Sequence, residues 1–303
     1  MTAGPAAAHP PGGERASATI GRAAVELAAA GVASPRVDAE LLAAHVLGVP
    51  RARLLLVDSF PAEVAARYGT LVAARAARTP LQHLVGHAPF RQLGLAVGPG
   101  VFVPRPETEL LAGWGLAAIA GLASPLVVDL CSGSGAIALA VAQEAPGARV
   151  VAVERSPRAL EWLRRNVAAR AAAGDRPVEV VAGDVTDPDL LYDLRGQVDL
   201  ALCNPPYVPA AADVPAEVAG HDPAEAVFGG PDGLAVIRPV IALAARLLRP
   251  GGAVGVEHDD THGDAVVDLL AADGRFVEVA AHPDLLGRPR FGAARLARGR
   301  LSW

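Results

Sequence analysis

Apolar residues recur at helical spacing through the first quarter of the chain. Intervals of three and four separate them, as in amphipathic helices, in the stretches 18–32, 34–48 and 59–79. The first of these helices is expected to turn one face inward, made of Ile20, Val25, Leu27 and Ala28. The pattern predicts a small helical domain over 19–84, preceded by a disordered tail over 1–18.

The spacing changes to short alternation between Pro80 and Pro106. The segment 89–106, PFRQLGLAVGPGVFVPRP, alternates around a Gly-Pro-Gly turn, which predicts a β-hairpin or extended linker over 85–106. The next stretch, 106–122, is predicted as a helix with acidic residues in its first turn, where the helix dipole favours them.

From Pro125 onward, short apolar runs alternate with helical segments. The runs that we predict to be strands are 126–131, 149–154, 178–183, 198–203 and 253–258. Buried strands that alternate with helices are typical of a parallel sheet covered by helices on both faces. The runs 275–284 and 290–298 resemble an antiparallel pair that closes this sheet. We therefore predict an α/β fold for 107–303.

Composition limits the partners and the compartment. The 303 residues are 52% hydrophobic and carry a formal charge of −5, which allows a sizeable core and argues against an extended nucleic-acid footprint. The chain has only two cysteines, which gives no sign of a disulfide framework and is consistent with a reducing cytoplasm. We see no apolar run that reaches the ~18 residues of a membrane span, and residues 1–17 lack the apolar core of a signal peptide. We expect a cytoplasmic protein with neither a membrane nor a stable nucleic-acid partner.

Candidate ligand-binding residues follow the ends of the predicted strands, where open α/β sheets bind their ligands. The first strand runs through Asp129 into the loop CSGSG, in which Gly133 and Gly135 let the backbone approach a ligand. The helix that starts near Ala136 directs free N–H groups and a positive dipole end at the same place. Structural turns also produce a lone G-x-G, so this loop needs support from its context.

The second and third strands supply that context. Glu154 ends the second strand about twenty residues after the loop, where an acid can accept from both ribose hydroxyls of a nucleoside cofactor. Asp184 follows the third strand and is placed to accept from an adenine amine, with Val185 against the ring. The alternative for Asp184 is a helix cap.

Two cofactor classes share this geometry. Dinucleotide enzymes carry G-x-G-x-x-G, and the third glycine position is Ala138 here. Enzymes that use S-adenosylmethionine (SAM) carry D-x-G-x-G-x-G and an acid on the second strand. Asp129, Gly133 and Gly135 fit that pattern, so the loop favours SAM.

The fourth strand ends in the turn Asn204-Pro205-Pro206-Tyr207. Proline lacks a ladder donor and fixes φ, so two prolines end the strand and stiffen the turn. The Asn204 side-chain amide and the Pro205 carbonyl can both accept from a planar –NH2 group, and Tyr207 can stack on its face. The turn therefore predicts a site for an amide or an aromatic amine nitrogen.

Such a nitrogen is a poor nucleophile because its lone pair is delocalised, and we see no strong base beside the turn. Catalysis would then rest on positioning against the methyl sulfonium and on hydrogen bonds that strengthen as charge develops on nitrogen. This interpretation assigns catalysis to Asn204, Pro205 and Tyr207, and substrate binding to the whole turn with Pro206.

Taken together, the motifs resemble the PrmC (HemK) family, the peptide chain release factor glutamine N5-methyltransferases. The resemblance runs from about Ile20 to Ala297 and is carried by PLQHLVGHAPF, VFVPRPETELL, DLCSGSGAIALA, AVERSPRALEWLRRN, NPPYVP, HDPAEAVFGGPDGL, LLRPGGAVGVEH and PDLLGRPRF. N-P-P-Y alone also occurs in adenine-N6 methyltransferases, and its combination with PRPETE is far more specific.

The resemblance implies a fold and a reaction. The fold is a helical substrate-binding domain (19–84), a hairpin linker (85–106) and a class I SAM-dependent methyltransferase domain (107–303) with a Rossmann-like seven-stranded sheet. The reaction is methyl transfer from SAM, without a metal, to the glutamine of the Gly-Gly-Gln loop of class-1 release factors.

Position by position, the resemblance assigns residues to this reaction. SAM binding falls on Asp129, Cys131, Ser132, Gly133, Ser134, Gly135, Glu154, Asp184, Val185 and Asn204. Arg105 and Glu107 of PRPETE are placed beside the pockets and order the site. The chain departs from the family at Cys131-Ser132, where Gly-Thr is usual, at Val185, where an aromatic residue is frequent, and at His262, where glutamine is frequent.

Other functions compete with this one. A sister family methylates glutamine in a ribosomal protein, and adenine-N6 methyltransferases of nucleic acids share the N-P-P-Y chemistry. The charge of −5 and the short helical domain disfavour the latter. A binding module that kept the fold without catalysis is the third class, and the presence of Glu154 and Asn204 argues against it. Cys131 and Cys203 are read as two small buried residues rather than a redox pair.

Overall fold

The computed structural model describes residues 15–299, which divide into two compact units between Val85 and Gly86. Most of the expected tail lies outside the described residues. The part inside them differs from the expectation, because the first helix begins at Ala16. Arg15 forms an isolated bridge with Ser59 directly before it.

The first unit is helical. Its elements are α1 (Ala16–Ala29), α2 (Pro35–Leu47), the 3-10 helix η1 (Arg51–Leu56), α3 (Ala62–Ala76) and α4 (Leu81–Val85). Ile20 and Leu27 of α1 are buried in the core of this unit, as expected, whereas Val25 is 71% exposed. Placing Val25 and Ala28 on the inner face was wrong, because residues 20 and 27 are two turns apart on one face, and residues 25 and 28 are exposed on another.

The second unit begins with a two-stranded hairpin of β1 (His87–Phe90) and β2 (Leu93–Ala96). An extended segment then leads to helix α5 (Thr108–Ala118), whose Thr108 and Leu111 are buried. The hairpin and helix that the sequence predicted are therefore present.

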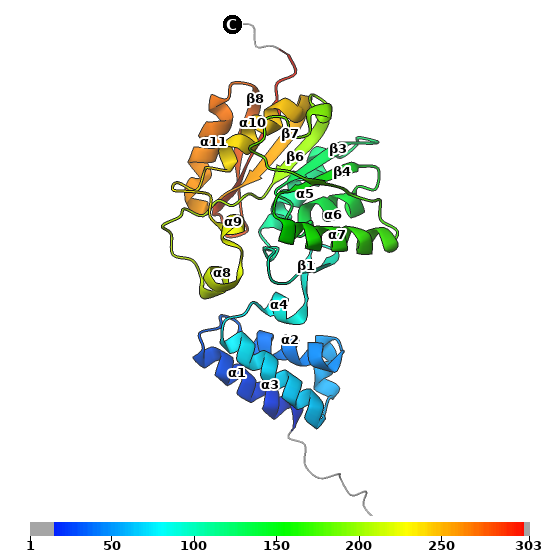
Figure 1. The fold of residues 1–303 in the computed structure, drawn as a ribbon, viewed down its shortest axis with the longest axis vertical. Helices are drawn as coiled ribbons and strands as arrows, with labels where there is room; N and C mark the ends of the chain where they lie inside the picture. The colour runs from blue at the N-terminus through cyan, green and yellow to red at the C-terminus, as the bar shows by residue number, and fades with distance from the viewer. Residues whose placement is uncertain (1–14, 300–303) are drawn as a thin grey trace, which may run out of the picture. The chain divides into compact units, whose positions relative to one another are not determined.

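Within the described residues the main sheet has seven strands in the order β5-β4-β3-β6-β7-β9-β8 (Figure 1). They are β3 (Leu126–Leu130), β4 (Arg149–Glu154), β5 (Glu179–Ala182), β6 (Val198–Cys203), β7 (Leu248–Glu257), β8 (Phe276–Pro283) and β9 (Pro289–Leu296). Strands β3 to β7 pair in parallel, and β9 is antiparallel to both β7 and β8. The predicted α/β fold and its closing antiparallel pair are confirmed.

Helices cover both faces of this sheet. One hydrophobic cluster joins the strands to α5, α6 (Ala136–Glu144) and α7 (Pro157–Ala172), and a second joins them to α10 (Ile237–Leu247) and α11 (Gly263–Ala272) (Figure 1). Shorter elements complete the unit: η2 (Tyr192–Leu194), α8 (Ala216–His221), α9 (Ala224–Val227) and η3 (Asp260–His262). In the part of the chain that the structure describes, we find no helix that combines the length and the apolar character needed to span a bilayer.

The strand order places the candidate residues at one edge. Strand β3 has β4 on one side and β6 on the other, so the chain reverses its winding direction there. Parallel strands end at the same edge, and ligands bind where the winding reverses. Residues after β3, β4, β6 and β7 therefore meet at that edge.

Candidate active site

The loop after β3 is shaped by residues with left-handed backbone. The φ angles are 60° at Cys131, 55° at Gly133 and 89° at Gly135. A Cβ on Gly135 would lie 2.6 Å from Cδ1 of Leu163, so glycine lets the loop pack on α7. A Cβ on Gly133 would meet nothing within 4 Å, which leaves space beside the backbone. Cys131 holds the strained conformation without being glycine, at a cost of about 1 kcal/mol.

Glu154, the last residue of β4, is tied to this loop. Its carboxylate accepts from the backbone N–H of Gly133 at 2.9 Å, of Arg155 at 2.8 Å and of Ser156 at 2.7 Å. Ser132 N also donates to Val153 O at 2.9 Å, so loop and strand end are joined twice. Backbone donors fix the direction of the carboxylate, which suits an acceptor of ligand hydroxyls.

Asp129 lies beneath the loop and is 1% exposed. Its Oδ2 accepts from Ala138 N at 3.1 Å, and among residues 15–299 no group hydrogen-bonds to Oδ1. Burial raises the pKa of Asp129 to about 7, against the hydrogen bonds that lower it. A buried carboxyl oxygen without a partner under a glycine loop fits a site that takes a polar or cationic ligand.

Asp184 interacts mainly with its own turn. It accepts from Thr186 N at 2.9 Å and Oγ1 at 2.8 Å, and it pairs with Arg155 at 3.2 Å. These contacts, the backbone N–H of Thr186 first, lower the pKa of Asp184. Val185 is buried against the second hydrophobic cluster. The contacts are those of the capping alternative, and the adenine role of both residues stays a prediction.

The turn after β6 is rigid on two sides. Pro205 and Pro206 are buried. A Cβ on Gly229 would lie 2.6 Å from Pro206 O, and one on Gly233 would lie 2.4 Å from Tyr207 O. The segment 229–233 therefore holds the turn by direct backbone approach, which only glycine permits.

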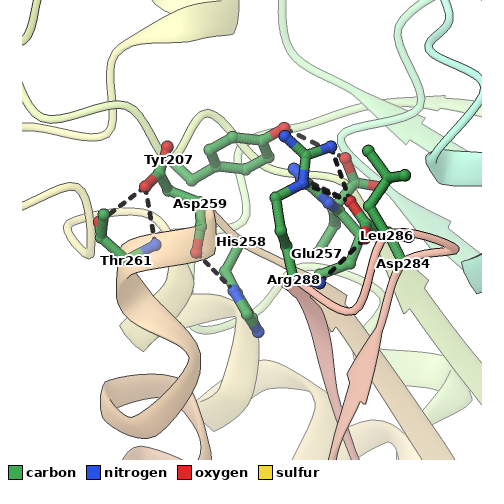
Figure 2. A network of polar contacts seen from close by, with 9 residues as sticks. Tyr207, Glu257, His258, Asp259, Thr261, Asp284, Leu286 and Arg288 are labelled. Carbon is green, nitrogen blue, oxygen red and sulfur yellow. Dashed lines mark hydrogen bonds and ion pairs between the residues drawn. The ribbon is translucent and has the colours of Figure 1, made fainter.

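The side chains of the turn point to two residues that the sequence analysis missed. Asn204 Nδ2 donates to Thr108 Oγ1 at 3.0 Å. The Tyr207 hydroxyl donates to Glu257 Oε1 at 3.2 Å, as Figure 2 shows. Glu257 ends β7, so the rule that selected Glu154 at the end of β4 would have selected it as well.

Glu257 is 1% exposed, and burial raises its pKa to about 7. The hydroxyls of Thr108 and Tyr207 and the Arg290 guanidinium act in the opposite direction. Burial likewise raises the pKa of Tyr207, and the carboxyl of Glu257 adds to the effect. The phenol therefore remains protonated and can keep donating to Glu257.

Arg105 and Glu107 occupy the segment before α5. Arg105 Nη2 donates to Asp222 Oδ2 at 2.8 Å, and its guanidinium lies 4.7 Å from the centre of the Phe102 ring. Glu107 is the residue before the helix and makes no side-chain cap. The Arg105 ion pair joins this segment to Asp222, which follows α8 (Ala216–His221). The site-ordering role of Arg105 and Glu107 remains a prediction.

Three other residues have structural contacts. A Cβ on Gly233 would lie 2.6 Å from Cε1 of His262, so this ring packs on the segment 229–233. Cys203 is buried as expected, whereas Cys131 is half-buried, so reading Cys131 as buried was wrong. Burial, followed by contact with Cys131, raises the pKa of the Cys203 thiol well above its ordinary value. Such a thiol is unreactive.

Among the described residues there is no group of three or more His, Cys, Asp or Glu side chains that could hold a metal ion.

The seven-stranded, mostly parallel sheet and its covering helices are those of a class I SAM-dependent methyltransferase. Residues 113–219 match the family model described as "Methyltransferase small domain", and residues 19–86 match the one described as "PrmC N-terminal domain". The solved hMettl16 catalytic domain in complex with MAT2A 3'UTR hairpin 6 has a similar fold. Its TM-score is 0.53 at 16% identity, over 80% of this chain and 84% of that chain.

Curated relatives are more specific. The "Release factor glutamine methyltransferase" of Mycolicibacterium smegmatis is 58% identical over 94% of this chain and 99% of its own length. That of Mycobacterium tuberculosis H37Rv is 52% identical over 91% of this chain and 90% of its own. The chain belongs to the release factor glutamine methyltransferase family.

Proposed function

We propose that the protein transfers a methyl group from SAM to N5 of the glutamine in the Gly-Gly-Gln motif of class-1 peptide chain release factors. One observation carries the proposal. The Asn204 amide directs its Nδ2 to Thr108 at 3.0 Å, which leaves Oδ1 to accept from a substrate –NH2 group. Family membership then selects the glutamine of a release factor among the possible amides.

The residues around the loop after β3 suit the cosubstrate. Glu154 is the candidate acceptor for ribose hydroxyls, and the space beside Gly133 admits a ligand against the backbone. The unpartnered Oδ1 of Asp129 offers a hydrogen-bond acceptor below the loop. When bound, SAM supplies an electrophilic methyl group on a positively charged sulfur.

The turn after β6 performs the work on the substrate side. Asn204 Oδ1 and the Pro205 carbonyl accept from the two N–H groups of the glutamine amide and fix its plane. Tyr207, whose hydroxyl is held by Glu257, offers its ring to the face of that amide. These acceptors favour positive charge on the nitrogen as it forms its new bond, so they stabilise the transition state more than the ground state.

An exposed apolar turn beside the site supports a protein substrate. Leu285 and Leu286 are 91% and 79% exposed between β8 and β9. The turn is fixed by buried Asp284, which accepts from Leu286 N at 2.9 Å and from Arg288 Nε at 2.8 Å (Figure 2). Exposed leucines on a rigid turn are typical of a contact surface. Replacing both by serine should raise KM for a folded release factor and leave SAM affinity unchanged.

The helical unit carries a second surface of this kind. Leu55 and Leu56 of η1 are 93% and 81% exposed. We assign this unit to substrate binding, so Leu55→Ser with Leu56→Ser should weaken methylation of a folded release factor. A short Gly-Gly-Gln peptide should be methylated equally well by the parent and by the double variant, because it lacks the rest of the folded release factor. Equal loss with both substrates would contradict the assignment.

Mass spectrometry tests the proposed function. Purified class-1 release factor is incubated with the protein and SAM, then digested and mapped. One added methyl group on the Gly-Gly-Gln glutamine, absent with Asn204→Ala, is the expected result. If the protein binds SAM but gives no such product, the proposed substrate is wrong, and ribosomal proteins and nucleic acids are the next substrates to test.

A further inference from the structure

The direction of the Asn204 amide decides whether the turn can work. A side-chain amide has a donating end and an accepting end, which differ only by rotation about one bond. A substrate –NH2 group needs the accepting end, because two facing –NH2 groups have no acceptor between them. Some other group must therefore hold Asn204 with Oδ1 toward the substrate.

Thr108 is the group in contact with the opposite end. It is the first residue of α5, is 3% exposed, and accepts from Asn204 Nδ2 at 3.0 Å. A hydroxyl, however, can donate as well as accept. Thr108 alone would tolerate either direction of the amide, since its proton could point at Oδ1 instead.

Glu257 removes that freedom. Strands β6 and β7 pair Cys203 with Val256, so Asn204 and Glu257 follow side by side at the same sheet edge. The Glu257 carboxyl is 1% exposed; its Oε1 accepts from Tyr207, and no hydrogen bond from the described residues reaches Oε2. The Thr108 hydroxyl lowers the pKa of Glu257, and the unpartnered Oε2 is an acceptor that this hydroxyl can use.

We propose that Thr108 and Glu257 are positioning residues, in which the Glu257 carboxylate accepts a hydrogen bond from the Thr108 hydroxyl and thereby leaves Thr108 only an acceptor for Asn204. The amide is then locked with Nδ2 inward and Oδ1 toward the substrate. The same carboxylate holds the Tyr207 hydroxyl, so one buried acid orients both working side chains of the turn. The inference rests on the proposed function, since it explains how Asn204 selects an amide.

The test uses the full-length chain, a Gly-Gly-Gln peptide and SAM. Thr108→Val keeps the shape and removes the hydroxyl, whereas Thr108→Ser keeps the hydroxyl. Ser124→Ala is the matched control, because it also removes a hydroxyl, from an exposed residue in the loop before β3 that lies outside the candidate site. Turnover, SAM affinity and the unfolding temperature are measured for each protein.

Thr108→Val should lower kcat about tenfold to a hundredfold, as expected when a buried amide loses its partner. Its SAM affinity should stay within about twofold of the parent. Thr108→Ser should recover most of the turnover, a rescue that a merely structural role would not give. Should Thr108→Val fail to fold, Thr108→Ala takes its place with the same expectations. Parent-like turnover in the variant without a hydroxyl, or a serine variant as poor as it, would overturn the inference.

Failure of the proposed function is distinguishable from failure of the inference. A parent protein that methylates no release factor would refute the function. The side-chain amide protons of Asn204, observed by NMR, still report on the hydrogen bond in that case. They should exchange faster with solvent in Thr108→Val than in the parent and in Ser124→Ala. Unchanged exchange would refute the positioning role by itself.

Discussion

Two glutamates end strands of the same sheet and are held in opposite ways. Glu154 at the end of β4 is half-buried and accepts from three backbone N–H groups in the described structure. Glu257 at the end of β7 is 1% exposed and accepts from the side chain of Tyr207. A carboxylate satisfied by backbone keeps its position whatever the neighbouring side chains are. A carboxylate held by side chains, such as that of Glu257, is shielded from water and has a raised pKa. Its position depends on each of those side chains.

Under the proposed function, this difference corresponds to the two halves of the reaction, cosubstrate binding and methyl transfer. The β4 edge offers an open, solvated acceptor and a glycine loop, which suit a cofactor that enters and leaves. The β6–β7 edge offers a fixed, desolvated set of side chains, in which electrostatic interactions are stronger. Changes at the first edge should therefore alter binding of SAM, and changes at the second should alter turnover.

Asn204→Ala should have the largest effect. Removing the acceptor for the substrate amide should lower kcat about 10²–10³-fold, the scale seen when one preorganised group is lost from an active site. SAM affinity, measured by calorimetry, should remain near that of the parent. Equal losses in both quantities would erase the distinction between the two edges.

Glu154→Ala should weaken SAM binding by about 1.5–3 kcal/mol, because charge-assisted hydrogen bonds to the cofactor are lost. At saturating SAM the turnover number should change little. Glu161→Ala, which removes the same charge from an exposed position on α7, is the matched control. An unchanged dissociation constant for Glu154→Ala would rule out its ribose role.

Burial of Glu257 should make stability depend on pH. Its pKa is about 7 in the folded protein and 4.5 ordinarily, so the folded state binds more protons between these values. The unfolding free energy therefore falls as pH rises through this window, by up to about 3 kcal/mol. The groups that face this carboxyl are Thr108, Tyr207, Arg290 and Glu107.

Comparing the parent with Glu257→Gln isolates the pH dependence that Glu257 contributes. Asp129, whose pKa is also about 7, is retained in both proteins, so its contribution cancels. Denaturant titrations at a series of pH values should show the parent losing stability relative to the variant as pH rises. A difference in unfolding free energy that stays constant over this pH range would mean that the pKa of Glu257 is the same in the folded and unfolded states. The ionisation that lowers stability also supplies the acceptor that Thr108 needs.

Gly135→Ala should bear least on the comparison between the two edges. It should lower the unfolding free energy by about 1–3 kcal/mol. The new Cβ would meet Leu163 and Leu139 at 2.6 and 3.1 Å, and φ is +89°. Gly174→Ala has φ of +99° and no atom within 4 Å of the new Cβ, so it measures the backbone cost alone. Equal destabilisation of both variants would show that the packing contact is unimportant.

The sequence sufficed for the fold because strands and helices are local periodicities, and their alternation restricts the topology. It also singled out Asn204 as a candidate, since two prolines after a buried run are a strong signal, and the role of Asn204 stays a prediction. It missed Thr108, which is 96 residues from Asn204 in the chain and meets it only through packing of α5 on the sheet. Glu257 carried the same strand-end signal as Glu154 but lacked a glycine loop to draw attention to it.

Gly229 and Gly233 close against the carbonyl oxygens of Pro206 and Tyr207, and the two prolines fix φ from within. The turn therefore has little conformational entropy left to lose when a substrate arrives. A flexible loop would have to be ordered on binding, whereas under the proposed function this turn would meet the substrate amide already in its final shape. A side chain larger than hydrogen at either glycine would reopen the turn and return that entropic cost to each catalytic cycle.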